Sequence, residues 1–451
     1  MLQFNVLRIS NIIKIYSHIE KKIIKMSGED INVKQPFAFN LFRRFLFVLS
    51  IIYGAVVSLR LWLYEKQILK SRKAPCFVIS IGNIVAGGSG KTPMAIYIAE
   101  MVKSMGFNPV VISRGYGGNL RKKSSKTCRS DSYEMKTLIN NSRVSVSDIY
   151  GNVVVGDGNK VFETPEVVGD EPFMMASRLS FPVIVGKDRF KAAIMALNMS
   201  YSKPNKTNGK IDSFSKKKND NFLGVPNIAN IDVIILDDGF QHIRLKRDLD
   251  IVLMDYSRPF GNGYLLPSGR LREPPKRAID RSDIIILTRY NSDHLKSVDG
   301  SYLEKNLSYK GKNKTCFVTK HKPFLHSFLH KAKPFSTNIT NLKGRKGCLF
   351  SGIADNQSFR KTVENLGVSV KAHLEFNDHH MYKSWEILTI LDTFKECGAD
   401  LLITTEKDYA RLGMDKKYIW AMDFAVIGIE IDFLDKKDDF QNVIYKKICE
   451  K

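Results

Sequence analysis

The stretch Val78–Thr92 (VISIGNIVAGGSGKT) constrains the fold of this chain more than any other part of it. An apolar run typical of a β-strand leads into a glycine-rich loop that ends in Gly90-Lys91-Thr92. In such a loop, glycines let backbone N–H groups close around phosphate oxygens, the lysine reaches the β- and γ-phosphates, and the threonine hydroxyl reaches Mg²⁺. The following segment, Pro93–Met105, has apolar residues at helical spacing. The order strand, loop, helix therefore predicts a phosphate-binding loop in an α/β fold.

The loop departs from the usual P-loop pattern in its first half. Val85 stands where the pattern has glycine, and the doublet Gly87-Gly88 supplies glycines closer to the lysine. This doublet resembles the variant loop of the chromosome-partitioning ATPases, in which a lysine takes the place of Ala86. A glycine-rich turn without a ligand is the alternative, but the flanking strand and helix favour a nucleoside triphosphate. The expected nucleotide-binding residues are Gly87, Gly88, Ser89, Gly90, Lys91 and Thr92.

A second apolar run, Ile231–Leu236, ends in two acidic residues, Asp237 and Asp238. P-loop enzymes hold Mg²⁺ with the help of an acid at the end of a second buried strand. Either aspartate could be that acid, and Asp238 is preferred because it lies further out of the strand. One of the two could instead cap a helix.

The charge of the chain favours anionic partners. Its 451 residues include 70 Lys and Arg against 46 Asp and Glu, a net charge of +24, which suits a nucleotide, nucleic acid, acidic lipid or phosphorylated substrate. Part of the excess lies in Arg121–Lys126 and Lys203–Lys218, which have the composition of solvated insertions. The six cysteines form no Cys-x-x-Cys pair and are interpreted as reduced thiols of a cytosolic protein.

An uncharged apolar segment, Phe45–Leu59, lies near the N-terminus between Arg43-Arg44 and Arg60. As a helix it would fall short of a full hydrocarbon core, so a monotopic anchor on an anionic leaflet is expected. A buried core helix and a tilted single span are the alternatives. Residues 1–26 are basic and rich in Ile but have no cleavage site typical of a signal peptide.

Strand-like and helix-like segments alternate after the loop, as a mostly parallel sheet flanked by helices requires. The polar stretches 121–150 and 203–222 are expected to be surface insertions. Four units are predicted. They are a basic extension (1–35), a membrane-associated helix (36–68), a P-loop kinase-like domain (69–315) and a smaller α/β domain (316–451).

Between about residues 40 and 415 the chain contains the motifs SIGNIVAGGSGKTP, ISRGYGG, VGDEP, VIVGKDR, LDDGFQH, DLDIVLMD, FGNGYLLPSGRLREP, FSGIADNQSF, FNDHH and TTEKD. This succession of motifs resembles that of the tetraacyldisaccharide 4′-kinases, the lipid A 4′-kinases. The resemblance implies transfer of the ATP γ-phosphate, with Mg²⁺, to the 4′-hydroxyl of tetraacyldisaccharide 1-phosphate. It also implies work at the cytoplasmic face of the inner membrane, where an N-terminal helix anchors members of the family.

The resemblance also implies roles for individual residues. Asp170 of VGDEP would be the general base, oriented or tuned by His379, and the pair would place the active site between the two domains, which would have to close. A carboxylate paired with a histidine is suited to accepting a hydroxyl proton. On residue type alone, Asp170 could equally be a helix cap and His379 a loop residue.

Charge neutralisation falls to Lys91 and Mg²⁺, with Arg270 and Arg272 as further phosphate contacts. The two arginines could instead be a surface pair that holds a loop. The expected metal-site residues are Thr92, one of Asp237 or Asp238, and Glu273. Candidate substrate residues are Arg114, Tyr116, Gln241 and His242.

Two other protein classes compete with a lipid kinase. A partitioning-type ATPase would explain the glycine doublet, the charge and the anchor, but not GRLREP or DHH. A nucleic-acid-binding protein would suit the pI of about 9.6, yet the sequence has no recognisable nucleic-acid-binding motif. The expected partners are therefore an anionic glycolipid and inner-membrane lipids, with no nucleic acid and no obligate protein partner.

Overall fold

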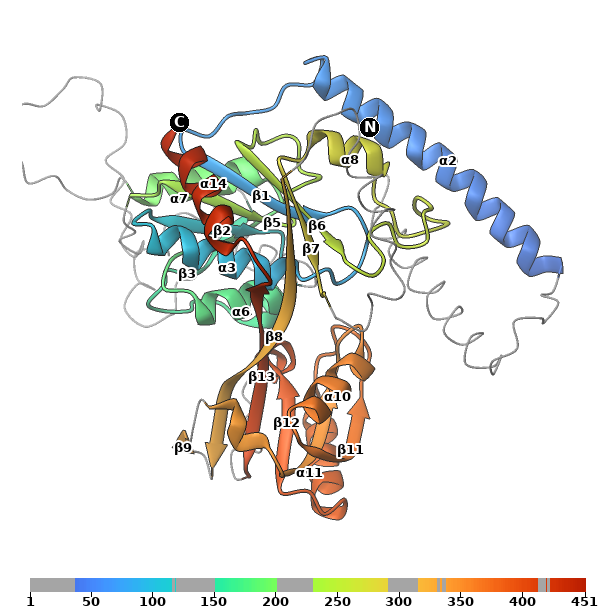
Figure 1. Ribbon diagram of the computed structural model, residues 1–451, viewed down its shortest axis with the longest axis vertical. Coiled ribbons are helices and arrows are strands. Elements are labelled where there is room, and N and C mark those ends of the chain that lie inside the picture. The colour runs from blue at the N-terminus through green and yellow to red at the C-terminus, as the bar shows by residue number, and fades with distance from the viewer. Residues whose placement is uncertain are drawn as a thin grey trace, which may run out of the picture.

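The computed structural model describes residues 37–115, 118, 151–200, 230–290, 315–330, 333–334, 338–412, 419 and 422–451. The predicted extension 1–35, the predicted insertions 121–150 and 203–222, and the candidate substrate residue Tyr116 lie outside these ranges. Within them, one continuous sheet runs through two units placed one above the other in Figure 1.

The larger part, called the core unit below, contains the P-loop and a seven-strand portion of the sheet in the order β7-β6-β1-β5-β2-β4-β3. All neighbours are parallel except β3, which runs antiparallel to β4. The strands are β1 (Phe77–Asn83), β2 (Pro109–Ser113), β3 (Asn152–Gly156), β4 (Val183–Gly186), β5 (Val233–Asp237), β6 (Leu249–Asp255) and β7 (Ile284–Thr288). The helices are α3 (Lys91–Ser104), α5 (Pro165–Val168), α6 (Asp170–Arg178), α7 (Arg189–Ser200) and α8 (Pro275–Arg281).

Both faces of this sheet are buried, and its strands are apolar at most positions. Successive side chains of β1 point to opposite faces, so Ile79 packs in the cluster that includes α3 while Val78 packs in the cluster that includes α7. A parallel sheet covered by helices on both sides needs such continuous apolar runs. The predicted α/β fold with a mostly parallel sheet is confirmed.

The second part, called the small unit below, is the smaller α/β unit expected in the C-terminal part of the chain. Its three parallel strands have the order β11-β10-β12. The elements are η4 (Ile339–Leu342), β10 (Lys346–Ser351), α10 (Asn356–Asn365), β11 (Ser369–Glu375), α11 (Ser384–Glu396), β12 (Leu401–Thr405) and α12 (Glu406–Arg411).

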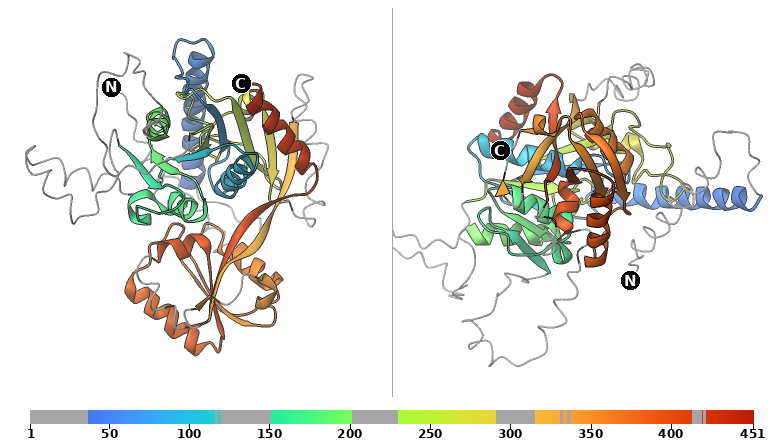
Figure 2. Two further views of the ribbon diagram at one scale, coloured as in Figure 1. Left: turned by 90° about the vertical axis from the view of Figure 1, so that its left-hand side faces the viewer. Right: turned by 90° about the horizontal axis from the view of Figure 1, so that it is seen from below.

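Two long strands join the units, and neither was predicted. β8 (Thr315–His330) pairs with β7 at its start and then antiparallel with β13 (Phe424–Phe433), and β13 also pairs with β12. The short β9 (Lys333–Pro334) pairs with the end of β8. The left-hand view of Figure 2 shows these two strands crossing from one unit to the other.

The predicted small domain 316–451 extends too far. Helix α14 (Lys437–Cys449) returns to the core unit, where Phe440, Ile444 and Ile448 join the same hydrophobic cluster as β1. The reason is the direction of β13, which carries the chain back along β8 before α14 begins (Figure 1). The small unit is therefore inserted between two segments of the core unit and is not a separate C-terminal domain.

The N-terminal helix α2 spans Phe37–Glu65, close to the predicted unit 36–68 and well beyond the uncharged segment Phe45–Leu59 on which the expectation of a short anchor rested. Its 29 residues correspond to about 43 Å at ~1.5 Å per residue, so the expectation of a helix too short for a hydrocarbon core is wrong. Arg43, Arg44 and Arg60 lie within the helix rather than at its ends. Among the described residues, Leu41–Glu65 is the one segment long and apolar enough to cross a membrane.

One face of α2 packs on the core unit and the other is exposed. Leu46 and Leu61 are buried, and the Arg277 side chain of α8 donates a 3.0 Å hydrogen bond to the Ser58 carbonyl. The right-hand view of Figure 2 shows the helix projecting beyond the sheet. The exposed apolar residues are Leu41, Phe42, Phe45, Phe47, Val48, Ile51, Ile52, Val56, Leu59 and Trp62.

Candidate active site

The glycine-rich loop lies between the end of β1 and the start of α3, in the order strand, loop, helix that the sequence predicts. Gly90 is the N-cap of α3 and has φ of 78°, a left-handed conformation that favours glycine. Lys91 follows it, and its ammonium group lies 3.3 Å from Asn83 Oδ1, 3.4 Å from the Gly87 carbonyl and 3.9 Å from Asp238. Burial lowers the pKa of Lys91 below its usual value, although the charge of Asp238 acts in the opposite direction.

The two aspartates at the end of β5, Asp237 within the strand and Asp238 directly after it, have different surroundings. Asp237 is buried and accepts a 3.0 Å hydrogen bond from Ser113 on Oδ2, while its buried Oδ1 has no hydrogen-bond partner among the described residues. Burial, with the charges of Glu171 and Asp238, raises the pKa of Asp237 to about 7.

Asp238 has a φ of 51°, which is unusual for a non-glycine residue, and both its oxygens accept from Nη1 of Arg272 at 2.8 and 3.1 Å. Burial alone would raise the pKa of Asp238, but Lys91 and Arg272 lower it below its usual value.

This donor set fits a magnesium ion. Mg²⁺ prefers oxygen ligands and is commonly held by one or two carboxylates together with substrate phosphates. The unpartnered Oδ1 of Asp237 is a buried acceptor of the required kind, and Thr92 is buried at the start of α3. The oxygens of Asp238 are already engaged by Arg272, so Asp237 carries the freer ligand atom, although the sequence favoured Asp238.

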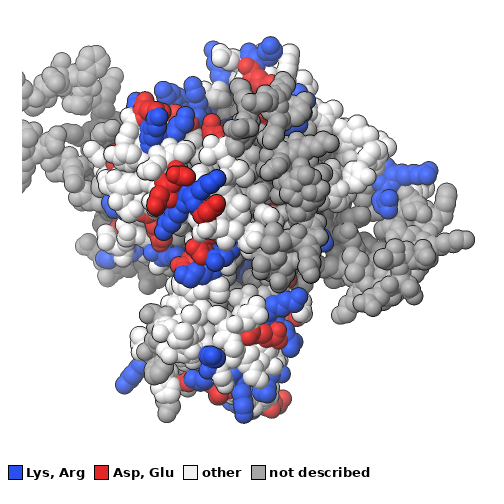
Figure 3. All heavy atoms as spheres, viewed as in Figure 1, with Lys and Arg blue, Asp and Glu red and all other residues white. Residues whose placement is uncertain are grey.

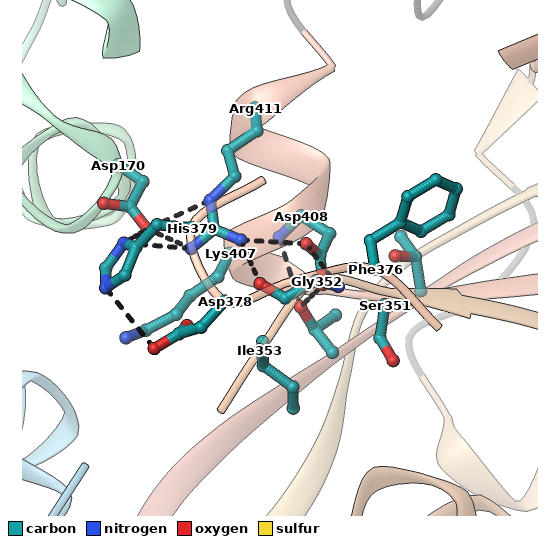
Figure 4. A network of polar contacts seen from close by, with 12 residues as sticks. Asp170, Ser351, Gly352, Ile353, Phe376, Asp378, His379, Lys407, Asp408 and Arg411 are labelled. Atoms are coloured by element: carbon teal, nitrogen blue, oxygen red, sulfur yellow. Dashed lines mark hydrogen bonds and ion pairs between the residues drawn. The ribbon is translucent and has the colours of Figure 1, made fainter. Parts of the chain in front are cut away.

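The predicted pair Asp170 and His379 is brought together from the two units (Figure 4). Asp170 begins α6 of the core unit and is 6% exposed, while His379 lies in the loop between β11 and α11 of the small unit. His379 Nδ1 is 3.2 Å from Asp170 Oδ2. The hydrogen bond to Asp170 raises the pKa of His379 above its usual value.

The carboxylate of Glu171, the residue after Asp170, links the Asp170–His379 pair electrostatically to the glycine-rich loop. Glu171, the following residue of α6, acts electrostatically on both Lys91 and Asp237. Through Glu171, the start of α6 that carries Asp170 therefore lies within electrostatic range of Lys91 in the glycine-rich loop and of Asp237 at the end of β5.

A family model described as tetraacyldisaccharide-1-P 4′-kinase matches residues 42–136 and 146–449. The chain belongs to this family. The tetraacyldisaccharide 4′-kinase of Desulfatibacillum aliphaticivorans is 33% identical over 409 residues, which cover 89% of this chain and 91% of the relative. That of Syntrophus aciditrophicus is 33% identical over 415 residues, which cover 91% and 93%.

The fold comparison agrees with the family. A crystal structure of an apo form of LpxK from Aquifex aeolicus in complex with ATP superposes with a TM-score of 0.60 at 27% identity, and the match covers 90% of this chain and 99% of that one. The resemblance to the tetraacyldisaccharide 4′-kinases inferred from the motifs is confirmed.

In this member of the tetraacyldisaccharide 4′-kinase family, Glu273 does not have the surroundings of a metal ligand. It is 1% exposed, and each of its oxygens already accepts two hydrogen bonds. Arg281 donates to both oxygens at 2.8, 3.1 and 3.3 Å, and Gln241 donates to Oε1 at 3.0 Å. Because no acceptor capacity remains on the carboxylate, the expected metal contact is not supported, and Glu273 instead holds Gln241 and Arg281 in place.

The candidate substrate residues are dispersed. Gln241 donates to the Asn83 carbonyl at 2.9 Å at the end of β1, so it supports the P-loop directly. His242 has a buried Nε2 without a partner among the described residues, and burial lowers the pKa of His242 to about 4. Arg114 is exposed after β2.

Further cationic and imidazole groups surround the P-loop, and sequence reasoning selected only one of them. An added Cβ at Gly87 would lie 4.0 Å from Arg270 Nη1, one at Gly88 3.5 Å from Arg289 Nη2, and one at Gly90 2.7 Å from His321 Nε2. Arg270 was predicted. Arg289 follows β7 and His321 lies on β8, and no motif at either position marked them.

Proposed function

We propose that this protein transfers the γ-phosphate of ATP to the 4′-hydroxyl of tetraacyldisaccharide 1-phosphate, giving the 4′-phosphorylated lipid A precursor. The observation that carries the proposal is the pairing of Asp170 with His379 across the two units, next to Glu171, whose charge acts on the loop lysine Lys91. A P-loop alone serves many nucleotide-dependent proteins, but a buried carboxylate paired with a half-buried histidine adds a base for an alcohol acceptor.

The nucleotide side of the reaction belongs to the core unit. Backbone N–H groups of the loop at Gly87–Gly90 and the start of α3 would bind the phosphates, with Lys91 and Arg270 adding positive charge. When bound at Asp237 and Thr92, Mg²⁺ would neutralise charge on the phosphate oxygens.

The acceptor side of the reaction depends on Asp170 and His379. The 4′-oxygen forms a bond to the γ-phosphorus while the bond from that phosphorus to the bridging oxygen of ADP breaks, and the hydroxyl proton passes to Asp170 or through it to His379. Asp170 suits this role because His379 can share the proton at 3.2 Å. Its burial keeps water from competing with the alcohol.

The lipid substrate gives the helix α2 a function. We propose that its exposed apolar face lies in or across the inner membrane, with Arg43, Arg44 and Arg60 near anionic headgroups and the catalytic units on the cytoplasmic side. An acceptor with its acyl chains in the bilayer requires a kinase held at the lipid surface.

Nucleic acid and obligate protein partners are not part of the proposal. On the face drawn in Figure 3, the Lys and Arg side chains of the described residues are interspersed with Asp and Glu and form no continuous basic surface. Nucleic-acid-binding proteins usually gather such charge on one face or along a helix.

The direct test measures transfer of radiolabelled γ-phosphate from ATP to tetraacyldisaccharide 1-phosphate in detergent micelles. The wild type should form labelled bisphosphorylated lipid, and Lys91→Met and Asp170→Asn should lose at least about 100-fold in rate. Lys103→Met, on the same helix as Lys91, and Asp392→Asn, at an exposed position of α11, are matched controls expected to retain activity.

Undiminished transfer by Asp170→Asn would keep the kinase and remove Asp170 as the base. Absence of lipid labelling by the wild type, with ATP hydrolysis intact, would refute the proposed function and favour a switch ATPase.

A further inference from the structure

We propose that Arg411, a buried arginine of the small unit, is a positioning residue that holds Asp170 and His379 in their reactive arrangement. This inference rests on the proposed function of that pair. Arg411 lies at the end of α12 and is 2% exposed, and its guanidinium reaches across to α6 of the core unit (Figure 4).

Every donor of the guanidinium has a neighbouring acceptor. Nε and Nη2 of Arg411 both donate to Oδ2 of Asp170, the former at 3.1 Å. Nη1 donates to the Gly352 carbonyl at 2.6 Å and to Asp408 Oδ1 at 3.0 Å. Nη2 also lies 3.4 Å from His379 Nδ1. A planar fork whose Nε, Nη1 and Nη2 all donate to acceptors on Asp170, Gly352 and Asp408 cannot be reproduced by lysine.

The small unit builds a rigid support for this arginine. Asp408 is fully buried and accepts hydrogen bonds from Tyr382 at 3.0 Å, from the Gly352 N–H at 3.0 Å and from the Thr405 hydroxyl at 2.6 Å. Thr405 in turn caps α12 by accepting from the Asp408 N–H. Two residues of the motif TTEKD, Thr405 and Asp408, therefore hold the Arg411 side chain in place through these hydrogen bonds.

Arg411 and Asp170 compete for the same nitrogen of His379. When Nδ1 carries a proton it can donate to Asp170 at 3.2 Å, and when Nδ1 is free it can accept from Arg411 at 3.4 Å. The pair can thus hold or release a proton without leaving Nδ1 unpartnered. Arg411 should also reduce the proton affinity of both groups, because its positive charge lies beside them.

The charged groups around Asp170 act together. Burial alone would raise the pKa of Asp170, but the hydrogen bond from His379 and the charge of Arg411 lower it below its usual range. The charged groups that face the pair are Arg411 and Lys407 from α12, Asp378 from the loop of the small unit, and Glu171 from α6.

The test compares Arg411→Met, Arg411→Lys and Lys407→Met in the full-length protein. Lys407 is the matched control because it also crosses from α12 to α6, but it pairs with Glu171 at 2.5 Å rather than with Asp170. For each protein, kcat and KM for lipid phosphorylation are measured as a function of pH. The titration of the His379 imidazole is followed separately by NMR of ¹⁵N-histidine-labelled protein. The His379 signal is identified by its loss in His379→Gln.

Arg411→Met should lower kcat about 10- to 100-fold with little change in the KM for ATP. It should move the acid limb of log kcat/KM, and the titration of His379, about one unit or more to higher pH. Arg411→Lys should have an intermediate kcat and should leave the midpoints of both pH curves near those of the wild type. Lys407→Met should shift these midpoints less than Arg411→Met does.

Loss of activity in Arg411→Met without movement of either pH curve would overturn the proposal, because a merely structural residue would behave in that way. If Arg411→Met does not fold, the double variant Arg411→Met/Asp408→Asn removes the buried charge pair together and is read in the same way. Failure of both neutral variants to fold would also count against a positioning role. A wild type that transfers no phosphate, with the His379 titration shifted as expected in Arg411→Met, would refute the proposed function alone.

Discussion

The hydroxyl of Tyr53 on the apolar helix α2 donates a 2.8 Å hydrogen bond to the backbone carbonyl of Arg272, whose guanidinium holds Asp238 beside Lys91. A segment suited to a membrane is therefore bonded to the backbone of a residue that contacts Asp238 beside Lys91. The two residues are 219 positions apart in the chain.

Removing this hydrogen bond with Tyr53→Phe should lower kcat for lipid phosphorylation by about 2- to 10-fold, because one hydrogen bond of about 0.5–1.5 kcal/mol no longer fixes Arg272. The assay measures kcat and both KM values in micelles. Tyr64→Phe, in the last turn of the same helix, is the control. Equal effects of the two substitutions would show that the helix acts as a whole rather than through Tyr53.

The exposed face of α2 should determine lipid binding. Ile52→Asp/Val56→Asp places two charges on that face and should reduce co-sedimentation with vesicles containing anionic lipid, because burying ionised carboxylates in a bilayer is unfavourable. Asn365→Asp/Thr389→Asp makes the same change in charge on exposed positions of the small unit and should leave binding unchanged. Unaltered co-sedimentation of the first variant would exclude this face as the anchor.

The stability conferred by His379 should depend on pH. Its folded-state pKa is raised by Asp170, so its contribution is fully present below the unfolded pKa of about 6.5 and is lost as the pH rises through the folded value. The difference in Tm between the wild type and His379→Gln should therefore be largest near about pH 6 and shrink towards about pH 9. Thermal unfolding in detergent measures it.

In the background Asp170→Asn, the pH dependence of that difference should largely disappear, since the charged partner is gone. A Tm difference that grows with pH in the wild-type background would contradict the pairing.

Helix α14 should stabilise the core unit rather than the small unit. Phe440 is fully buried, with its ring 5.0 Å from that of Phe317 and 4.8 Å from that of Phe433. Phe440→Ala should cost about 3–5 kcal/mol of unfolding free energy because it leaves a cavity in a packed cluster. Tyr445→Ala, at an exposed position of the same helix, should cost far less. Denaturant unfolding followed by Trp fluorescence compares them, and similar costs would argue against the assigned packing.

Much of the fold could be predicted because it depends on local patterns. The apolar runs Pro109–Ser113, Pro182–Gly186, Ile251–Met254 and Ile284–Leu287 agree within two residues with β2, β4, β6 and β7, since continuous apolar runs bounded by polar residues are typical of buried parallel strands. The linking strand β8 was missed because its residues alternate irregularly between buried and exposed and cross between two units.

The residues of the candidate site also fall into those that local sequence patterns indicate and those that depend on distant contacts. That Lys91 and Asp238 lie close together follows from local patterns, because Lys91 ends a glycine-rich loop and Asp238 follows a buried strand, and the two strands β1 and β5 are neighbours in the sheet. The sequence analysis expected Glu273 to bind metal. Nothing near Glu273 in the sequence indicates that Arg281, eight residues later, donates hydrogen bonds to both of its carboxylate oxygens.

By itself, the sequence determined the phosphate loop, the acids at the end of a buried strand and an apolar N-terminal helix, because neighbours along the chain suffice to define each of them. The tertiary structure alone decided that Arg411 meets Asp170 from 241 residues away, that Arg289 and His321 lie against the P-loop, and that α14 returns to the core unit. These contacts depend on how β8 and β13 cross between the units, and no local periodicity records the direction in which two distant strands pair.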